Sequence, residues 1–144
     1  MLALDTNVLV YAHRREAAEH EAAVALVNGL AEGTVPWGLP WPCVYEFFSV
    51  VTNTRIWSDA ASTPTQAWAQ LQAWLGAPSI QLLSEPEEFA DILGRFLALT
   101  RVRGAIVHDA RVAALCLAHG VEALLTRDRD FSLFRDLPTR NPFA

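Results

Sequence analysis

Acidic residues occupy four places in this sequence where the surrounding pattern favours apolar side chains. Asp5 and Asp128 each follow a short apolar run. Glu46 lies among aromatic residues, and Asp109 stands near the start of a helical pattern. A carboxylate in apolar surroundings is unfavourable unless a partner or a cation compensates its charge. One shared site explains the four positions more simply than four separate structural roles do.

A shared site for these carboxylates has a chemical consequence. Carboxylates in one crevice repel one another, which raises their pKa values. A divalent cation removes that conflict, and a set of oxygen ligands favours Mg²⁺ or Mn²⁺ over Zn²⁺. A cation held in this way lowers the pKa of a water molecule and neutralises charge on a phosphoryl group. The residue types therefore predict metal-dependent hydrolysis of a phosphodiester bond.

Each acid also has a purely structural interpretation. Asp5 could cap a helix, and Asp109 could compensate the dipole at a helix start. Asp128 could belong to a turn, and Glu46 could pair with an arginine. When each acid is considered separately, the sequence leaves its structural role open as an alternative.

The elements that must position the acids alternate between strands and helices. Strands are expected at residues 1–4, 34–39, 79–83 and 121–126, and helices at 8–13, 16–31, 42–51, 64–76, 86–97 and 108–119. Thr6 or Asn7 is expected to cap the first helix, and the tail to form turns around Phe131 and Phe134. Short connections without a linker or repeat predict a single domain over residues 1–144. The expected fold is an α/β three-layer sandwich with a mostly parallel central sheet, whose sites lie at the carboxyl ends of the strands.

Composition and charge restrict the class of protein further. The chain is 52% hydrophobic and 19% charged, which is typical of a globular protein. No basic leader precedes Asp5 and no apolar run is long enough to cross a bilayer, so we expect a cytoplasmic protein without a membrane partner. Cys43 and Cys116 lack the spacing of a metal site and are expected to be free and buried.

The basic residues are all arginines and are distributed unevenly. The net charge is −5, yet residues 1–94 contain 3 arginines and 11 acids, whereas residues 95–144 contain 8 arginines and 5 acids. Guanidinium groups match phosphate bidentately, so the last third could contact a polyanion. Solvated surface charge is the competing interpretation.

An ordered set of motifs runs along nearly the whole chain. Its members are Asp5-Thr6-Asn7, then Glu46 on an apolar helix, then His108-Asp109-Ala110-Arg111, then Leu125-Thr126-Arg127-Asp128 with Asp130 following. In this order the set resembles that of PIN-domain proteins, and most of all the VapC-like toxins of bacterial toxin–antitoxin pairs.

That resemblance implies an endoribonuclease that uses Mg²⁺ or Mn²⁺. The residues that match the family's acidic quartet are Asp5, Glu46, Asp109 and Asp128. Thr6 and Asn7 match positions that orient the first acid, and Thr126 matches a hydroxyl before the last one. Asp130 is an alternative to Asp128, which is favoured because the strand ends just before it. Apart from the resemblance, Arg101, Arg103 and Arg111 flank Asp109 in the sequence and are candidate contacts to RNA phosphates, with surface salt bridges as the competing role. Family members of this kind form homodimers and are inhibited by a small antitoxin that reaches into the acidic groove.

Other functions fit the sequence less well. A phosphatase or a phosphoacceptor domain requires an acid two residues after Asp5 or a lysine, but Asn7 stands there and the chain has no lysine. A nucleotide-binding fold requires a glycine-rich loop after the first strand, which is absent. A non-catalytic PIN-like scaffold that binds RNA or a protein remains the alternative. Loss of at least one acid of the quartet would indicate such a scaffold, and all four acids are present.

Overall fold

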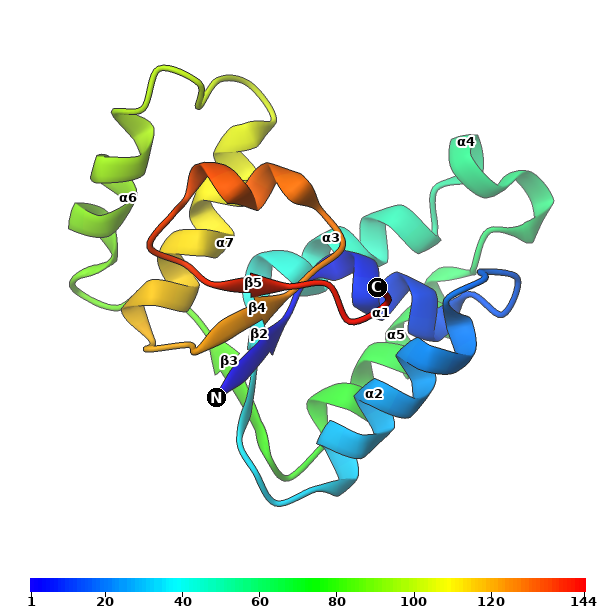
Figure 1. The fold of residues 1–144 in the computed structure, drawn as a ribbon. Helices are drawn as coiled ribbons and strands as arrows, with labels where there is room; N and C mark the ends of the chain where they lie inside the picture. The colour runs from blue at the N-terminus through cyan, green and yellow to red at the C-terminus, as the bar shows by residue number, and fades with distance from the viewer.

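The computed structural model describes residues 1–144 and contains one five-stranded sheet between helical layers (Figure 1). The strand order is β3-β2-β1-β4-β5, and every neighbouring pair is parallel. The strands are β1 (Leu2–Leu4), β2 (Trp37–Pro40), β3 (Ile80–Leu83), β4 (Ala123–Leu125) and β5 (Thr139–Arg140). The predicted α/β fold is confirmed, and the sheet is entirely parallel.

The helices connect these strands and cover both faces of the sheet. Figure 1 shows α6 and α7 on one side, α1, α2 and α5 on the other, and α3 beside the carboxyl ends of the strands. Their bounds are α1 (Thr6–His13), α2 (His20–Glu32), α3 (Trp41–Val51), α4 (Thr54–Trp57), α5 (Pro64–Leu75), α6 (Phe89–Leu97) and α7 (Ile106–Ala118), with 3₁₀ helices η1 (Ser58–Ala60) and η2 (Arg129–Leu133). None of these helices is long and apolar enough to span a membrane.

The centre of the sheet is buried on both faces, as expected for parallel strands covered by helices. All of β2 and β4 is buried, and in β1 Ala3 and Leu4 are fully buried. One apolar cluster extends in sequence from Ala3 to Leu137 and joins residues from both helical layers. The carboxyl ends of β1 and β4 are thereby fixed side by side, with Leu4 opposite Leu125.

Several element boundaries differ from the sequence prediction. Asp5, rather than Thr6 or Asn7, caps α1, because its extended backbone lets its carboxylate accept the Thr6 N–H at 2.8 Å. The second helix begins at His20 rather than at residue 16, after a stretch of turns. The last predicted helix begins at Ile106, two residues earlier than expected. The short elements α4, η1 and β5 were not predicted.

The tail after β4 is fixed by aromatic packing. Phe131 in η2 and Phe134 just after it are almost fully buried. The ring of Phe134 lies 4.8 Å from that of Phe96 in α6 and 6.3 Å from that of Phe131, measured between centroids. Because η2 begins directly after Asp128, this packing determines where Asp128 and Asp130 lie.

The variant Phe134→Ala tests this anchoring role. Removing a buried aromatic ring leaves a cavity, so the free energy of unfolding should fall by about 3–5 kcal/mol in a urea titration. Val35, which is 68% exposed, offers a control, since Val35→Ala should change the free energy by less than about 0.5 kcal/mol. Similar values for the two variants would contradict the anchoring role.

Candidate active site

The four predicted acids line one cavity at the carboxyl ends of the strands. Asp5 follows β1, Glu46 lies on α3, Asp109 lies in the first turn of α7, and Asp128 follows β4. The cavity has a volume of about 280 Å³, and no basic side chain lines it. The fold therefore concentrates negative charge at the edge of the sheet where parallel α/β folds place their sites.

Asp5 is the most strongly fixed of these acids. Its side chain is buried (6% exposed) and accepts hydrogen bonds from the Thr6 N–H at 2.8 Å, from Thr126 Oγ1 at 2.7 Å and from Asn7 Nδ2 at 3.1 Å. Burial raises the pKa of Asp5, the hydrogen bonds from Thr126 and Thr6 lower it, and nearby Glu46 and Asp128 raise it again. The hydrogen bonds thus orient a carboxylate that its surroundings otherwise disfavour.

Thr126 connects both ends of this hydrogen-bond network. Its hydroxyl donates to Asp5 and accepts from Asn7 Nδ2 at 3.0 Å and from the Asp128 N–H at 2.9 Å. The Arg127 N–H donates to Asn7 Oδ1 at 3.2 Å, which ties the start of α1 to the segment after β4. The structure thus places Thr6 and Asn7, which were predicted to orient the first acid, in contact with it, and Thr126 contacts it as well.

Glu46 reaches the cavity from α3, which begins directly after β2 and has Pro42 in its first turn. Cys43 and Phe47 on this helix are buried, whereas Glu46 is exposed to solvent. Thr6 Oγ1 donates to Glu46 Oε2 at 2.9 Å. Thr6 therefore contacts two acids, because its backbone N–H binds Asp5 and its hydroxyl binds Glu46.

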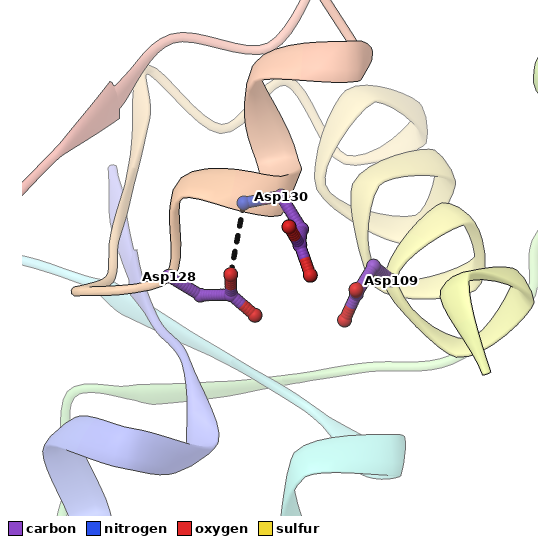
Figure 2. Close-up of side chains that lie close together, drawn as sticks. All are labelled: Asp109, Asp128 and Asp130. Carbon is purple, nitrogen blue, oxygen red and sulfur yellow. Dashed lines mark hydrogen bonds between the residues drawn. The ribbon is translucent and has the colours of Figure 1, made fainter. Parts of the chain in front are cut away.

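Asp109 and Asp128 meet a further carboxylate, that of Asp130, between α7 and η2, as Figure 2 shows. Oxygen atoms of Asp109, Asp128 and Asp130 lie within 4.8 Å of one another. The Asp130 N–H also donates to Asp128 Oδ1 at 2.8 Å, so Asp128 caps η2 while facing Asp109. Asp128 lines the acidic cavity itself, whereas Asp130 lies at its rim, in an adjoining hollow. Both candidates for the last acid are therefore near the site.

The electrostatic conflict is clearest at Asp109. Its pKa is raised to about 7, mainly by burial and then by the negative charges of Asp128, Asp5, Asp130 and Glu46. No cationic side chain offsets these charges within the cavity. A divalent cation would stabilise the ionised form of every acid in the group.

The donor set fits an oxygen-preferring cation. Cys43 brings a sulfur atom close to the acids, with its Sγ 3.7 Å from Asp5 Oδ1. Burial and the charge of Asp5 raise the pKa of the Cys43 thiol well above its usual value, so this group stays protonated. The donors that remain are carboxylate oxygens, which suit Mg²⁺ or Mn²⁺.

The three predicted phosphate contacts lie outside the acidic cavity. Arg111 forms an ion pair with Glu85 at 2.7 Å and lines a hollow of about 520 Å³ that adjoins the cavity. Arg101 lines a different hollow, and Arg103 is exposed in the loop between α6 and α7. The sequence placed these arginines near Asp109 but could not show the partner of Arg111, which is 26 residues away along the chain.

The fold and the site define an α/β protein with a parallel sheet and a cluster of acids at the carboxyl ends of its strands. Comparison with known proteins identifies its family. Residues 2–137 match the PIN domain, and the chain belongs to the PIN-domain family. It is 36% identical over 142 residues to VapC ribonuclease Mb2897 of Mycobacterium bovis and to ribonuclease VapC43 of Mycobacterium tuberculosis. Each alignment covers 99% of this chain and 95% of the relative. The predicted resemblance is confirmed.

Solved structures share the fold at lower identity. VapC20 of Mycobacterium tuberculosis, described as a sarcin-ricin loop cleaving toxin, has a TM-score of 0.67 and 16% identity, over 92% of this chain and 93% of that chain. VapBC2 of Rickettsia felis, bound to a DNA fragment from its promoter, has a TM-score of 0.69 and 16% identity, over 97% of both chains.

The raised pKa of Asp109 predicts a pH dependence of stability in the metal-free protein. The folded state binds this proton more tightly than the unfolded state, so the contribution of Asp109 to stability falls as pH rises from 3.8 to about 7. In EDTA, Asp109→Asn should raise the melting temperature more at pH 8 than at pH 5. The difference corresponds to about 1 kcal/mol, because solvent screens a half-buried group. Asp59→Asn, on exposed η1, is the control, and an equal gain at both pH values would contradict the charge conflict.

The Thr126 hydroxyl offers a second test of the site. Thr126→Val keeps the shape of the side chain but leaves Asp5 and the Asp128 N–H without this partner. The free energy of unfolding should fall by about 1–3 kcal/mol in a urea titration. Thr126→Ser keeps the hydroxyl and should retain most of the stability, so equal losses in both variants would show that packing, and not the hydroxyl, matters.

Proposed function

We propose that this chain is an endoribonuclease that hydrolyses RNA phosphodiester bonds with Mg²⁺ or Mn²⁺, as the toxin of a toxin–antitoxin pair. The observation that carries the proposal is the convergence of four carboxylates in a cavity without a basic side chain. Its support from relatives is full-length similarity to proteins named VapC ribonucleases.

The residues that would hold the cation are Asp5, Glu46, Asp109 and Asp128, with Asp130 beside the last two. When bound, a divalent cation activates water for attack on phosphorus and neutralises charge on the transferring group. Asp5 supplies a fixed oxygen, because Thr126 and the Thr6 N–H determine its orientation. Glu46 is exposed and held by Thr6, so it is suited to orient the attacking water toward phosphate.

A protein partner would bind over the same acidic cavity. The solved relatives include the complexes VapBC2 of Rickettsia felis and FitAB bound to a DNA fragment. In this chain, exposed Tyr45 and Val107 lie on the two helices that carry Glu46 and Asp109. A small antitoxin with a basic segment and apolar flanks fits this surface, because it would pair with the acids and cover the apolar groups. We also propose that the chain forms a homodimer, for which exposed Ile56 and Trp68 provide apolar surface.

Cleavage of RNA by the purified protein tests the proposal. A mixture of structured RNAs, including tRNA and rRNA, should be cut in Mg²⁺ or Mn²⁺ and remain intact in EDTA. Asp5→Asn and Asp109→Asn should each reduce the rate by at least about 100-fold, because each removes an anionic ligand of the cation. The exposed variant Asp59→Asn should cleave at the wild-type rate.

The outcomes separate the enzyme from the binding scaffold. Cleavage that persists in EDTA, or in both Asn variants, would contradict a metal-dependent acidic site. If no RNA is cut but RNA still binds, the scaffold alternative replaces the enzyme.

A further inference from the structure

A hollow of about 800 Å³ lies between the end of α6, the loop after it and the end of η2. It is separate from the acidic cavity and opposite to it in charge. Its polar lining consists of three arginines, two hydroxyl groups and one acid, namely Arg95, Arg101, Arg135, Thr100, Ser132 and Asp136.

The three arginines of this hollow are available to a ligand. None of Arg95, Arg101 and Arg135 forms an ion pair, although Asp136 is nearby. Arg14, Arg111 and Arg127 elsewhere in the chain are all paired with glutamates. Three unpaired guanidinium groups around one hollow repel one another, and an anion between them would relieve that repulsion.

A smaller hollow of about 440 Å³ has one lining residue in common with this hollow and one in common with the acidic cavity. The two basic hollows share Ser132, and the smaller hollow shares Asp128 with the acidic cavity. Arg129, which also lacks an ion pair, lines the smaller hollow between these two shared residues. A line of hollows therefore runs along η2, which Figure 1 shows passing from the end of β4 across α7. We call Arg95, Arg101, Arg129 and Arg135 the arginine track.

We propose that the arginine track binds backbone phosphates of an RNA strand on one side of the phosphate to be cleaved. The inference rests on the proposed function, which places the reacting phosphate in the acidic cavity. Guanidinium groups bind phosphate through paired N–H donors, and the hydroxyls of Thr100 and Ser132 add further donors. A single polyanion that enters the cavity and continues along η2 would meet these arginines in succession.

The charge of the rest of the molecule favours this assignment. The chain carries a net charge of −5, and its acidic cavity repels phosphate in the absence of a cation. Affinity for RNA must therefore come from phosphates outside the cavity, where contacts to arginine supply most of the binding energy. All four track residues belong to residues 95–144, the one part of the sequence with an excess of arginine. An acidic peptide would meet the same guanidinium groups and is the competing ligand that the binding test distinguishes.

RNA binding by matched charge variants tests the track. Every protein carries Asp109→Asn, so that the RNA stays intact in Mg²⁺, and the probe is a short fluorescent single-stranded RNA. Arg101→Gln with Arg135→Gln removes two track charges, and Arg15→Gln with Arg55→Gln removes two exposed, unpaired charges elsewhere.

The track variant should bind the RNA at least about 10-fold more weakly. The slope of the logarithm of its binding constant against the logarithm of salt concentration should become shallower by about 1.4, or about 0.7 for each lost phosphate contact. The control should stay within about 2-fold of the unmodified protein, because salt screens distant charges. Arg101→Lys with Arg135→Lys should restore the slope but only part of the affinity, since lysine keeps the charge without the paired donors.

Equal weakening in the track and control variants would overturn the proposal, because only net charge would then matter. Unchanged RNA binding in the track variant, together with lost binding of a hexaglutamate peptide, would overturn it in favour of an acidic protein partner. Binding is measured without cleavage. A wild-type protein that cuts no RNA would therefore contradict the proposed function and leave the binding comparison to decide the track by itself.

Discussion

Mutual repulsion among carboxylates held in one cavity is the constraint on which the rest of this structure depends. Asp5, Glu46, Asp109 and Asp128 share that cavity without a cationic side chain, and the negative charges around Asp109 add to the effect of its burial in raising its pKa to about 7. Such an arrangement persists only if the surrounding fold holds each acid in place more strongly than the charges push them apart. The site is thus electrostatically strained in a way that a bound cation would relieve.

Three features of the fold supply this restraint. Parallel pairing places the ends of β1 and β4 side by side, so that Asp5 and Thr126 meet and form the 2.7 Å hydrogen bond. The Thr126 hydroxyl then also accepts the Asp128 N–H, which fixes the start of η2. At the other end of η2, the packing of Phe134 against Phe96 holds this segment on α6. Core packing and the hydrogen-bond network therefore act together on the position of the acids.

The sequence predicted the order of the main strands and helices because periodic apolar runs form the buried layers. It missed β5 because Thr139–Arg140 is short, polar and defined only by pairing with β4. The convergence of the acids could be predicted from their places at the ends of strands and the starts of helices. The arrangement of Asp128 and Asp130 around Asp109 could not, because it depends on the turn that begins η2. Sequence proximity to Asp109 likewise suggested Arg111 as a phosphate contact, whereas long-range packing pairs it with Glu85.

The charge separation in the sequence has a counterpart in space, because an acidic cavity and a set of unpaired arginines lie along the same segment, η2. The central claim is that the acids form a binding site for a divalent cation. Anomalous X-ray scattering from crystals of the protein grown with Mn²⁺ tests it most directly. The account predicts a Mn²⁺ peak in the acidic cavity, within coordination distance of carboxylate oxygens of Asp5, Glu46, Asp109 and Asp128. Saturating Mn²⁺ with no peak in the cavity, or with peaks only elsewhere on the surface, would contradict it.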